Sequence, residues 1–263
     1  MGELIFIGLG LYDEKDISVK GKEAVQDADY VYSEFYTSSL SGCSMEDVEE
    51  ELGIDIKPLK RGEVESEAIP LKKAKDNKVV FLTGGDPMAA TTHVDLRLRA
   101  EVEGISTRII HSSSIFSAAP SLLGVQHYKF GKTVTLPFIS DKTYPESPYK
   151  GIKENIDRGL HTLILLDINS EDKEYMTVNE GIEALMELEE RIGDGVITED
   201  TIIAGLGRVG SDDPMIKADY PEELIDHNFG GGLHCMVLFG DLHFMEIDSL
   251  VTLADAPEKI KEE

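Results

Sequence analysis

The chain has 263 residues, of which 41% are hydrophobic, so it can form one large domain or two ordinary ones around a substantial core. Its 51 acidic residues outnumber the 25 lysines and arginines and give a net charge of −26 at pH 7. This charge excludes a general surface for nucleic acid or anionic membranes, because such surfaces need clustered Lys and Arg. No stretch approaches the roughly 20 apolar residues of a membrane span, and the start MGELIFIGLG lacks the basic segment of a signal peptide. We therefore expect a cytoplasmic protein.

The acidic excess has two explanations. One is a basic protein partner. The other is solvation in a saline cytoplasm, where salt screens the repulsion among the acidic groups. We favour the saline cytoplasm, in which the whole proteome is acidic.

The first half of the chain alternates short apolar runs with helical patterns. The apolar runs predict strands at 4–7, 29–33, 79–83 and 106–111. Helices are predicted after Ser18, over 44–52 between the caps Ser44 and Gly53, and over 89–100, with charged surface helix and loop at 60–78. Three of the strands end in glycine or serine turns. This pattern is typical of a doubly wound α/β sheet, which binds ligands at the carboxyl edge of its strands.

The turn Gly84-Gly85-Asp86-Pro87 follows the strand at 79–83. Two glycines allow a sharp bend and a close approach of the backbone to a ligand. Pro87 disfavours a helical conformation at Asp86 and so places that residue at the bend. Asp86 either caps the next helix or contacts a ligand, and the turn alone does not distinguish the two.

The second half repeats the α/β pattern. Strands are predicted at 133–138, 163–168 and 202–207 and, after the glycines at 230–232, up to 238; helices are predicted at 153–160 and 177–192, with a loop at 141–148. The pattern restarts after a break near 112–118. We therefore predict an N-terminal α/β domain over 1–115 and a C-terminal α/β domain over 116–263. The tail after Ala254 is expected to fray.

The sequence lacks the residue patterns that several common chemistries require. The seven histidines form no HExxH motif, so we predict no metal site. Cys43 and Cys235 lie far apart without metal-ligand spacing and are expected to be reduced packing residues. The Gly8-Leu9-Gly10 turn has Asp13 where a dinucleotide fingerprint needs its third glycine. No Walker A motif, nucleophile elbow or distinctive carboxylate pair is present. The glycine and serine turns at the strand ends lack the Lys or Arg side chains that bind phosphate. They therefore favour a ligand that is not highly anionic and is held largely by backbone groups.

Several motifs nevertheless resemble a known family. The stretches 8–13, 85–93 and 113–115 resemble the tetrapyrrole-methylase-like (class III) methyltransferases. Within them the chain is similar to the branch that modifies translation elongation factor 2, on the motifs 34–38, 93–100, 147–149, 159–163, 232–235 and 240–243. The resemblance covers about residues 2–250.

The resemblance implies a homodimer of subunits with two α/β domains and a cleft between them for S-adenosylmethionine. The methyl acceptor would be the aminocarboxypropyl-modified histidine of elongation factor 2, whose amino group receives three methyls to give diphthine. The positions that match the family's cofactor contacts are Leu9, Asp86, Ala89, Ser114, Ile115, Leu166, Leu206 (or its neighbour Gly207) and His234. Two positions depart from the pattern: Ala89 replaces a larger Val, and Phe239 replaces a Pro.

Methyl transfer from a sulfonium needs positioning more than acid–base chemistry, so we predict no catalytic side chain. Three of these site residues also have an interpretation that is purely structural. Asp86 can be a turn cap, Ser114 a helix cap and His234 a buried histidine satisfied by backbone. Tyr12 and Tyr36 either face the acceptor or pack in the core. Two other functions remain open: methylation of a tetrapyrrole, and a nucleotide-binding regulatory module without catalysis.

Overall fold

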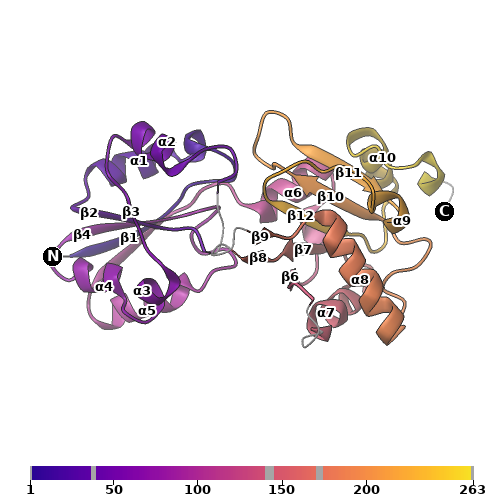
Figure 1. Cartoon of the computed structure of the whole chain (residues 1–263), viewed down its shortest axis with the longest axis horizontal. Coiled ribbons are helices and arrows are strands. Elements are labelled where there is room, and N and C mark those ends of the chain that lie inside the picture. Colours follow the sequence, from indigo (N-terminus) through magenta and orange to yellow (C-terminus); the bar gives the residue numbers. More distant parts are fainter. Residues whose placement is uncertain (1, 37–39, 140–144, 170–173, 262–263) are drawn as a thin grey trace. The chain divides into compact units, whose positions relative to one another are not determined.

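The computed structural model describes residues 2–36, 40–139, 145–169 and 174–261. The chain forms two compact units, the first ending at Ile115 and the second beginning at Phe116 (Figure 1). Each unit has its own five-stranded sheet. The predicted α/β fold class is confirmed, whereas the predicted cofactor cleft stays a prediction.

The sheet of the first unit is entirely parallel, with the order β3-β2-β4-β1-β5. Its strands are β1 (Glu3–Gly8), β2 (Tyr30–Glu34), β3 (Lys57–Pro58), β4 (Lys78–Thr83) and β5 (Ser106–Ile110). Because all five strands run in one direction, their carboxyl ends meet at one edge of the sheet, as the sequence predicts for a doubly wound arrangement.

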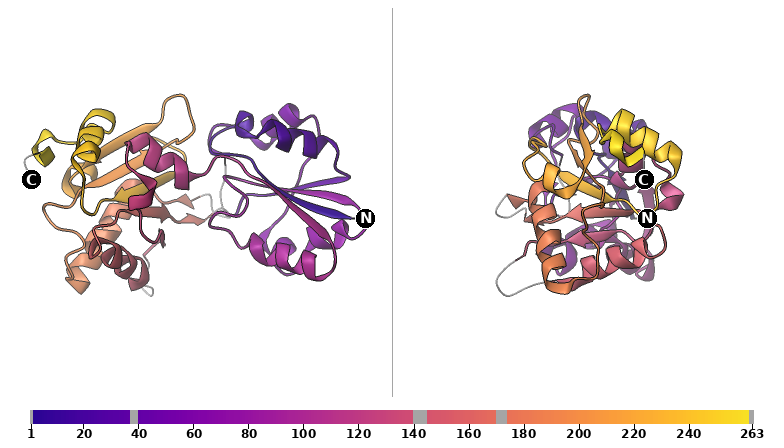
Figure 2. Two further views of the ribbon diagram at one scale, coloured as in Figure 1. Left: turned by 180° about the vertical axis from the view of Figure 1, so that it is seen from behind. Right: turned by 90° about the vertical axis from the view of Figure 1, so that its right-hand side faces the viewer.

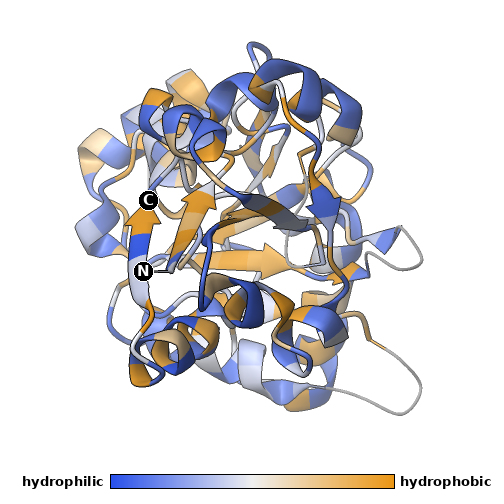
Figure 3. Ribbon diagram, turned by 90° about the vertical axis from the view of Figure 1, so that its left-hand side faces the viewer, coloured by the Kyte–Doolittle hydropathy of each residue, from blue (hydrophilic) through white to orange (hydrophobic). Residues whose placement is uncertain are grey.

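Helices cover both faces of this sheet (Figure 1). They are α1 (Val19–Gln26), α2 (Met45–Leu52), α3 (Arg61–Glu65), α4 (Ile69–Ala74) and α5 (His93–Val102), with a short 3₁₀ helix η1 (Glu14–Asp16). Successive residues of a strand face opposite sides. Leu4 and Phe6 of β1 therefore join the core under α3, α4 and α5, and Ile5 and Ile7 join the core under α1 and α2. Figure 3 shows mainly hydrophobic strands between helices of mixed hydropathy.

The sheet of the second unit has the order β11-β10-β12-β7-β6 and is mostly antiparallel. Its strands are β6 (Val134–Leu136), β7 (Thr162–Leu166), β10 (Ile203–Gly207), β11 (Met215–Asp219) and β12 (His234–Leu238). Only the β6–β7 pairing is parallel among the described strands of this sheet. A separate two-stranded sheet pairs β8 (Ile168–Asn169) with β9 (Glu174–Tyr175).

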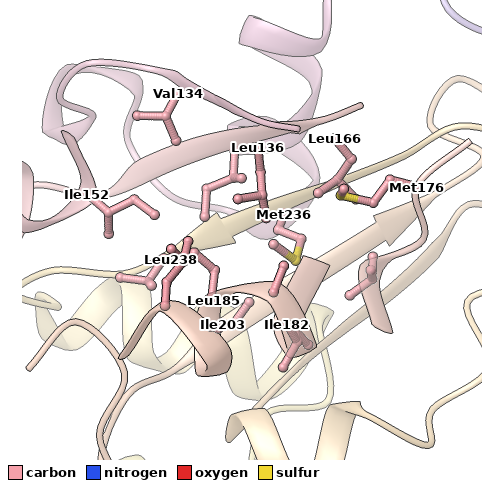
Figure 4. Close-up of a cluster of buried hydrophobic side chains, with 14 of the residues drawn as sticks. Val134, Leu136, Ile152, Leu166, Met176, Ile182, Leu185, Ile203, Met236 and Leu238 are labelled. Atoms are coloured by element: carbon pink, nitrogen blue, oxygen red, sulfur yellow. The ribbon is translucent and has the colours of Figure 1, made fainter. Parts of the chain in front are cut away.

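Helices flank this second sheet as well (Figure 2). They are α6 (Ile115–Leu123), α7 (Glu146–Ile156), α8 (Val178–Ile192), α9 (Pro221–Leu224) and α10 (Phe244–Leu253), with the 3₁₀ helices η2 (His127–Lys129) and η3 (Glu258–Lys261). The main core of the unit packs α7 and α8 against one face of the sheet. Figure 4 shows its central side chains, among them Leu136, Leu185, Met236 and Leu238.

Three local predictions were wrong. The helix predicted at 89–100 begins only at His93, because the backbone at Ala90 is left-handed with a φ of 54°. The helix predicted at 153–160 is α7, which begins at Glu146 inside the predicted loop and ends at Ile156; residues 141–144 of that loop lie outside the described residues. The tail after Ala254 does not fray over its described part, because η3 buries Ile260. No described helix is long and apolar enough to cross a membrane.

Candidate functional site

The ends of β1 and β4 lie in direct contact at the carboxyl edge of the first sheet. The N–H of Leu9 donates to the Thr83 carbonyl at 2.8 Å. Gly10 and Gly85 exchange two backbone hydrogen bonds of 3.3 and 2.6 Å. A Cβ atom at Gly8 would lie 2.3 Å from the Gly85 carbonyl oxygen, so only glycine permits this approach. The two glycine turns therefore pack backbone against backbone at this edge, and close approach to a ligand stays a prediction.

Asp16 folds the loop that follows β1. Its carboxylate oxygen Oδ2 accepts the N–H groups of Leu11 and Tyr12 at 3.0 and 2.7 Å. Its carbonyl accepts the hydroxyl of Ser112 at 3.1 Å, which joins this loop to the end of β5. The sequence analysis missed Asp16, because no local pattern indicates that a carboxylate will accept two N–H groups preceding it in the chain.

Asp86 serves the turn in which it lies. One carboxylate oxygen accepts the N–H of Met88 at 3.2 Å, and the other lies 2.7 Å from Nδ1 of His111. The Asp86 side chain is 14% exposed and that of His111 is 72% exposed. Asp86 does not cap the next helix, because α5 begins at His93 with Thr92 as its N-cap; it holds the turn instead, and contact with a cofactor stays a prediction. The sequence analysis missed the contact with His111, which lies 25 residues away.

The other predicted residues of the first unit surround this turn. Ala89 is half-buried, and its N–H donates to the Asp86 carbonyl at 3.2 Å. Ser114 and Ile115 are half-buried and lie just before and at the start of α6, after the end of β5. The structure thus places Leu9, Asp86 and Ala89 on adjoining turns, with Ser114 and Ile115 on the segment that follows the neighbouring strand β5.

Beneath the turn lies a buried polar group that the sequence analysis did not single out. Glu34 at the end of β2 and Thr83 at the end of β4 are opposite residues in the sheet, and the Thr83 hydroxyl donates to Glu34 Oε1. His93 lies 3.3 Å from the same oxygen through Nε2. All three side chains are almost completely buried. The Thr83 hydroxyl and Glu34 satisfy each other in this way, whereas Nε2 of His93 makes no hydrogen bond of normal geometry among the described residues.

The predicted residues of the second unit share one end of its sheet. Gly207 is opposite His234, and Leu206 is opposite Cys235. Cys235 is in turn opposite Leu165 of β7, so the next residue, Leu166, lies beside His234. Gly207, His234 and Leu166 thus form one row across the three strands. A Cβ atom at Gly207 would lie 3.1 Å from the His234 ring, which places these two residues on the same face. Leu206 points to the opposite face and is fully buried.

His234 is held by the first turn of α8. The N–H of Val178 donates to Nδ1 at 3.3 Å, so the neutral ring carries its proton on Nε2. Burial lowers the pKa of His234, and the nearby carbonyl of Gly230 opposes that effect only in part. Among the described residues Nε2 makes no hydrogen bond of normal geometry, although it is buried. His234 is therefore satisfied by backbone at one nitrogen and offers a buried donor at the other.

The two tyrosines differ in their packing: Tyr36 packs against a core, whereas Tyr12 is half-buried against a loop. Tyr36 packs against the core under α3, α4 and α5, and the guanidinium of Arg61 lies 5.1 Å from the centre of its ring. Burial raises the pKa of Tyr36. Tyr12 packs against Gly42, whose Cβ position would lie 2.4 Å from the ring.

Within the described ranges, no three His, Cys, Asp or Glu side chains gather so as to hold a metal ion. Cys235 is buried in the core, which raises its pKa to about 12. Cys43 is half-buried, and burial raises its pKa to about 11. These thiols are therefore poor nucleophiles and poor ligands at neutral pH.

Comparison with known proteins identifies the family. Residues 3–206 match the family described as Tetrapyrrole (Corrin/Porphyrin) Methylases. The chain belongs to this family and is a methyltransferase. It is 48% identical to a diphthine synthase of Methanothermobacter thermautotrophicus over 98% of both chains. It is 53% identical to a diphthine synthase of Methanocella arvoryzae, covering 95% of this chain and 98% of the other.

Solved structures agree with this assignment. A structure titled "Crystal structure of diphthine synthase" matches with a TM-score of 0.90 and 40% identity over 99% of both chains. A second, titled as a diphthine synthase from Entamoeba histolytica, matches with a TM-score of 0.88 and 38% identity over 98% of this chain and all of the other. The resemblance stated from the sequence motifs is confirmed.

Proposed function

We propose that this chain transfers methyl groups from S-adenosylmethionine to the aminocarboxypropyl-modified histidine of translation elongation factor 2, giving diphthine. The observation that carries the proposal is similarity to diphthine synthases at about half identity along almost the whole chain. A tetrapyrrole acceptor, the alternative left open by the sequence, has no such full-length support. A regulatory module without catalysis is excluded, because the chain is a methyltransferase.

The residues at the two sheet ends fit the proposed cofactor. At the first, Leu9, Asp86 and Ala89 lie on adjoining turns at the carboxyl edge of the parallel sheet, the edge where ligands of such sheets bind. At the second, Nε2–H of His234 is a buried donor that suits an acceptor nitrogen or oxygen of an adenosine. Leu166 is buried and offers an apolar wall, whereas Leu206, whose side chain points to the opposite face, can offer only its backbone. Ser114 and Ile115 complete the proposed set.

S-adenosylmethionine supplies a methyl group on a sulfonium that is already activated for transfer. The chain then has to orient the acceptor amine in line with that group, and positioning of this kind can account for most of the rate. A neighbouring positive charge and partial desolvation favour the neutral amine, which has the lone pair that attacks. We therefore assign no general base and no catalytic side chain.

We further propose that the protein acts as a cytoplasmic homodimer whose protein substrate is elongation factor 2. The net charge of −26 favours a basic docking surface on that substrate over any anionic partner. Sedimentation velocity should give a mass near twice the 29.0 kDa of one chain. A single species at the mass of one chain across the concentration range would remove the dimer from the proposal.

Mass spectrometry of elongation factor 2 tests the reaction. The factor, carrying the aminocarboxypropyl group on its histidine, is incubated with this protein and S-adenosylmethionine. We expect a gain of three methyls on that residue and no gain on a factor that lacks the group. If the factor gains no methyl while calorimetry shows the cofactor bound, the acceptor is wrong, and a tetrapyrrole becomes the next substrate to test.

A further inference from the structure

The Glu34–His93 pair lies directly beneath the turn that carries Asp86 and Ala89. Glu34 ends β2, and His93 begins α5, 59 positions further along the chain. Their side chains are 0% and 1% exposed, and Oε1 of Glu34 lies 3.3 Å from Nε2 of His93. Ionisable side chains are seldom buried so completely unless they are paired and hydrogen-bonded. The pair has no part in the reaction as described above, so its burial needs another explanation.

The carbonyl of Pro87 links this pair to the turn. It accepts a hydrogen bond from Nδ1 of His93 at 3.1 Å and another from the Thr91 hydroxyl at 3.2 Å. Since a carbonyl oxygen can only accept, His93 carries a proton on Nδ1. Pro87 directly follows Asp86 and precedes Ala89 by two residues. A shift of the Pro87 carbonyl would therefore move both of these residues.

Glu34 in turn is held from two directions. The Thr83 hydroxyl donates to Oε1, and the N–H of Tyr36 donates to Oε2 at 3.0 Å. The edge of the His93 ring packs against Phe81 of β4 with ring centres 5.1 Å apart. Glu34 is therefore fixed at the ends of β2 and β4 and contacts the His93 ring, although Nε2 of His93 makes no hydrogen bond of normal geometry among the described residues. His93 in turn holds the turn through its hydrogen bond to the Pro87 carbonyl.

The turn needs such an anchor, because its own backbone is strained. Ala90 has a φ of 54°, a left-handed conformation that costs a residue with a Cβ roughly 1 kcal/mol or more. Gly85 is also left-handed, with a φ of 69°, but glycine adopts this conformation without that cost, so the strain lies at Ala90. Strained conformations persist only where surrounding contacts determine them, and they cluster at ligand sites.

We infer that Glu34 and His93 are positioning residues for S-adenosylmethionine, holding the turn through the Pro87 carbonyl so that Asp86 and Ala89 meet the cofactor in one geometry. The inference rests on the proposed function for the identity of the ligand. It does not make either side chain a contact of the cofactor or of the acceptor.

The second unit supplies a matched control. Glu246 and His161 form another buried pair, 3% and 0% exposed, with a separation of 3.3 Å. His161 immediately precedes β7, whereas the predicted cofactor residue Leu166 ends that strand. This second pair lies at the opposite end of its sheet from the row of His234. Loss of its charge should cost stability without moving the cofactor site.

Calorimetric titration with S-adenosylmethionine compares the two pairs. Gln has one acceptor oxygen where Glu has two, so Glu34→Gln leaves a donor of Thr83 or Tyr36 unpaired. We expect Glu34→Gln to raise the Kd by about tenfold or more and Glu246→Gln to leave it within about twofold, with both variants folded by circular dichroism at the assay temperature. Equal effects of the two variants, or no effect of Glu34→Gln, would overturn the inference.

Two substitutions of His93 test the carbonyl contact itself. His93→Asn keeps an N–H near the position of Nδ1, whereas His93→Leu fills similar space without a donor. We expect His93→Asn to bind the cofactor more tightly than His93→Leu. Wild-type affinity in the His93→Leu variant would show that the hydrogen bond to Pro87 does not position the site.

Hydrogen exchange without cofactor separates this inference from the proposed function. The N–H groups of Met88 and Ala89 bond within the turn, so they report its order directly. We expect faster exchange at both in Glu34→Gln and wild-type exchange there in Glu246→Gln. If the wild-type protein binds no S-adenosylmethionine, the proposed function fails, and exchange still decides whether the pair orders the turn. Unchanged exchange in Glu34→Gln would overturn the inference.

Discussion

At the scale of single residues, Asp86 holds its own turn and also reaches the exposed edge. Its Oδ1 orders the turn through Met88, and its other oxygen lies beside His111 at the exposed edge. We expect Asp86→Ala to weaken binding of S-adenosylmethionine by at least about tenfold and to cost about 1 kcal/mol of stability through the lost turn bond. Asp86→Asn keeps an acceptor for Met88, so it should lose affinity without that loss of stability. Calorimetry and denaturant unfolding measure the two effects, and unchanged affinity in both variants would end the assignment of Asp86 to the cofactor.

The carboxyl group of Glu189 should make the stability of the protein depend on pH. Burial pushes the pKa of its carboxyl upward, but the N–H of Ile197, the Tyr149 hydroxyl and two further backbone N–H groups outweigh that effect and hold the pKa below its usual value. A depressed folded pKa stabilises the protein above the unfolded pKa, and this contribution disappears as the pH falls through the folded value. Glu189→Gln should therefore destabilise the protein by about 2 kcal/mol at pH 7.

Denaturant unfolding from pH 7 down to acid checks this sign. The difference in free energy of unfolding between wild type and Glu189→Gln should shrink as the pH falls below the unfolded pKa. Glu183→Gln on the exposed side of the same helix serves as the control and should show no such pH dependence. A difference that grows toward acid would contradict the assignment.

At the scale of elements, α2 shows how far local chemistry determines a helix. Its N-cap Ser44 forms a capping box with Asp47, and Gly53 ends it with a left-handed φ of 69°, as the sequence predicts. A Cβ atom at Gly53 would meet open space, so the cost of adding one is conformational. Gly53→Ala should lower the free energy of unfolding by about 1 kcal/mol.

Thermal and denaturant unfolding measure this cost. Gly62→Ala is a suitable control, because a Cβ atom there also meets open space while the residue lies inside α3 without a left-handed φ. Gly62→Ala should be neutral or stabilising, since Ala is the better helix former. Equal effects of the two substitutions would show that the left-handed conformation at Gly53 is not the cause.

Elements that local chemistry does not determine were predicted less well. The break predicted near 112–118 overlaps α6, which the sequence did not predict; proline usually ends a helix, yet α6 continues through Pro120 with Ala119 and Leu123 buried. Strand β11 went unpredicted, since four of its five residues are only half-buried at the edge of the sheet. The candidate site follows the same rule. Leu9, Asp86 and His234 were predicted as site residues from their motifs, whereas Thr83 and His93, the partners of Glu34, lie far from it along the chain.

At the scale of the whole molecule, the net charge of −26 predicts a dependence on salt. Like charges repel one another more strongly in the compact state, and salt screens them over a Debye length of about 10 Å at 0.1 M. We expect Tm to rise as KCl increases from low concentration to 1 M. A matched series in sucrose separates screening from preferential exclusion. A Tm that stays flat in KCl would contradict adaptation to a saline cytoplasm.

The sequence by itself determined the α/β class, most strands, the helix α2 with its caps, the helix α8, and membership in the methylase family. These follow from periodicity, capping and motifs, which act over a few residues. Only the tertiary structure decided the antiparallel order of the second sheet, the late start of α5 at His93 and the burial of Glu34 beneath the turn. These depend on which distant segments pack together, and no local preference specifies that choice.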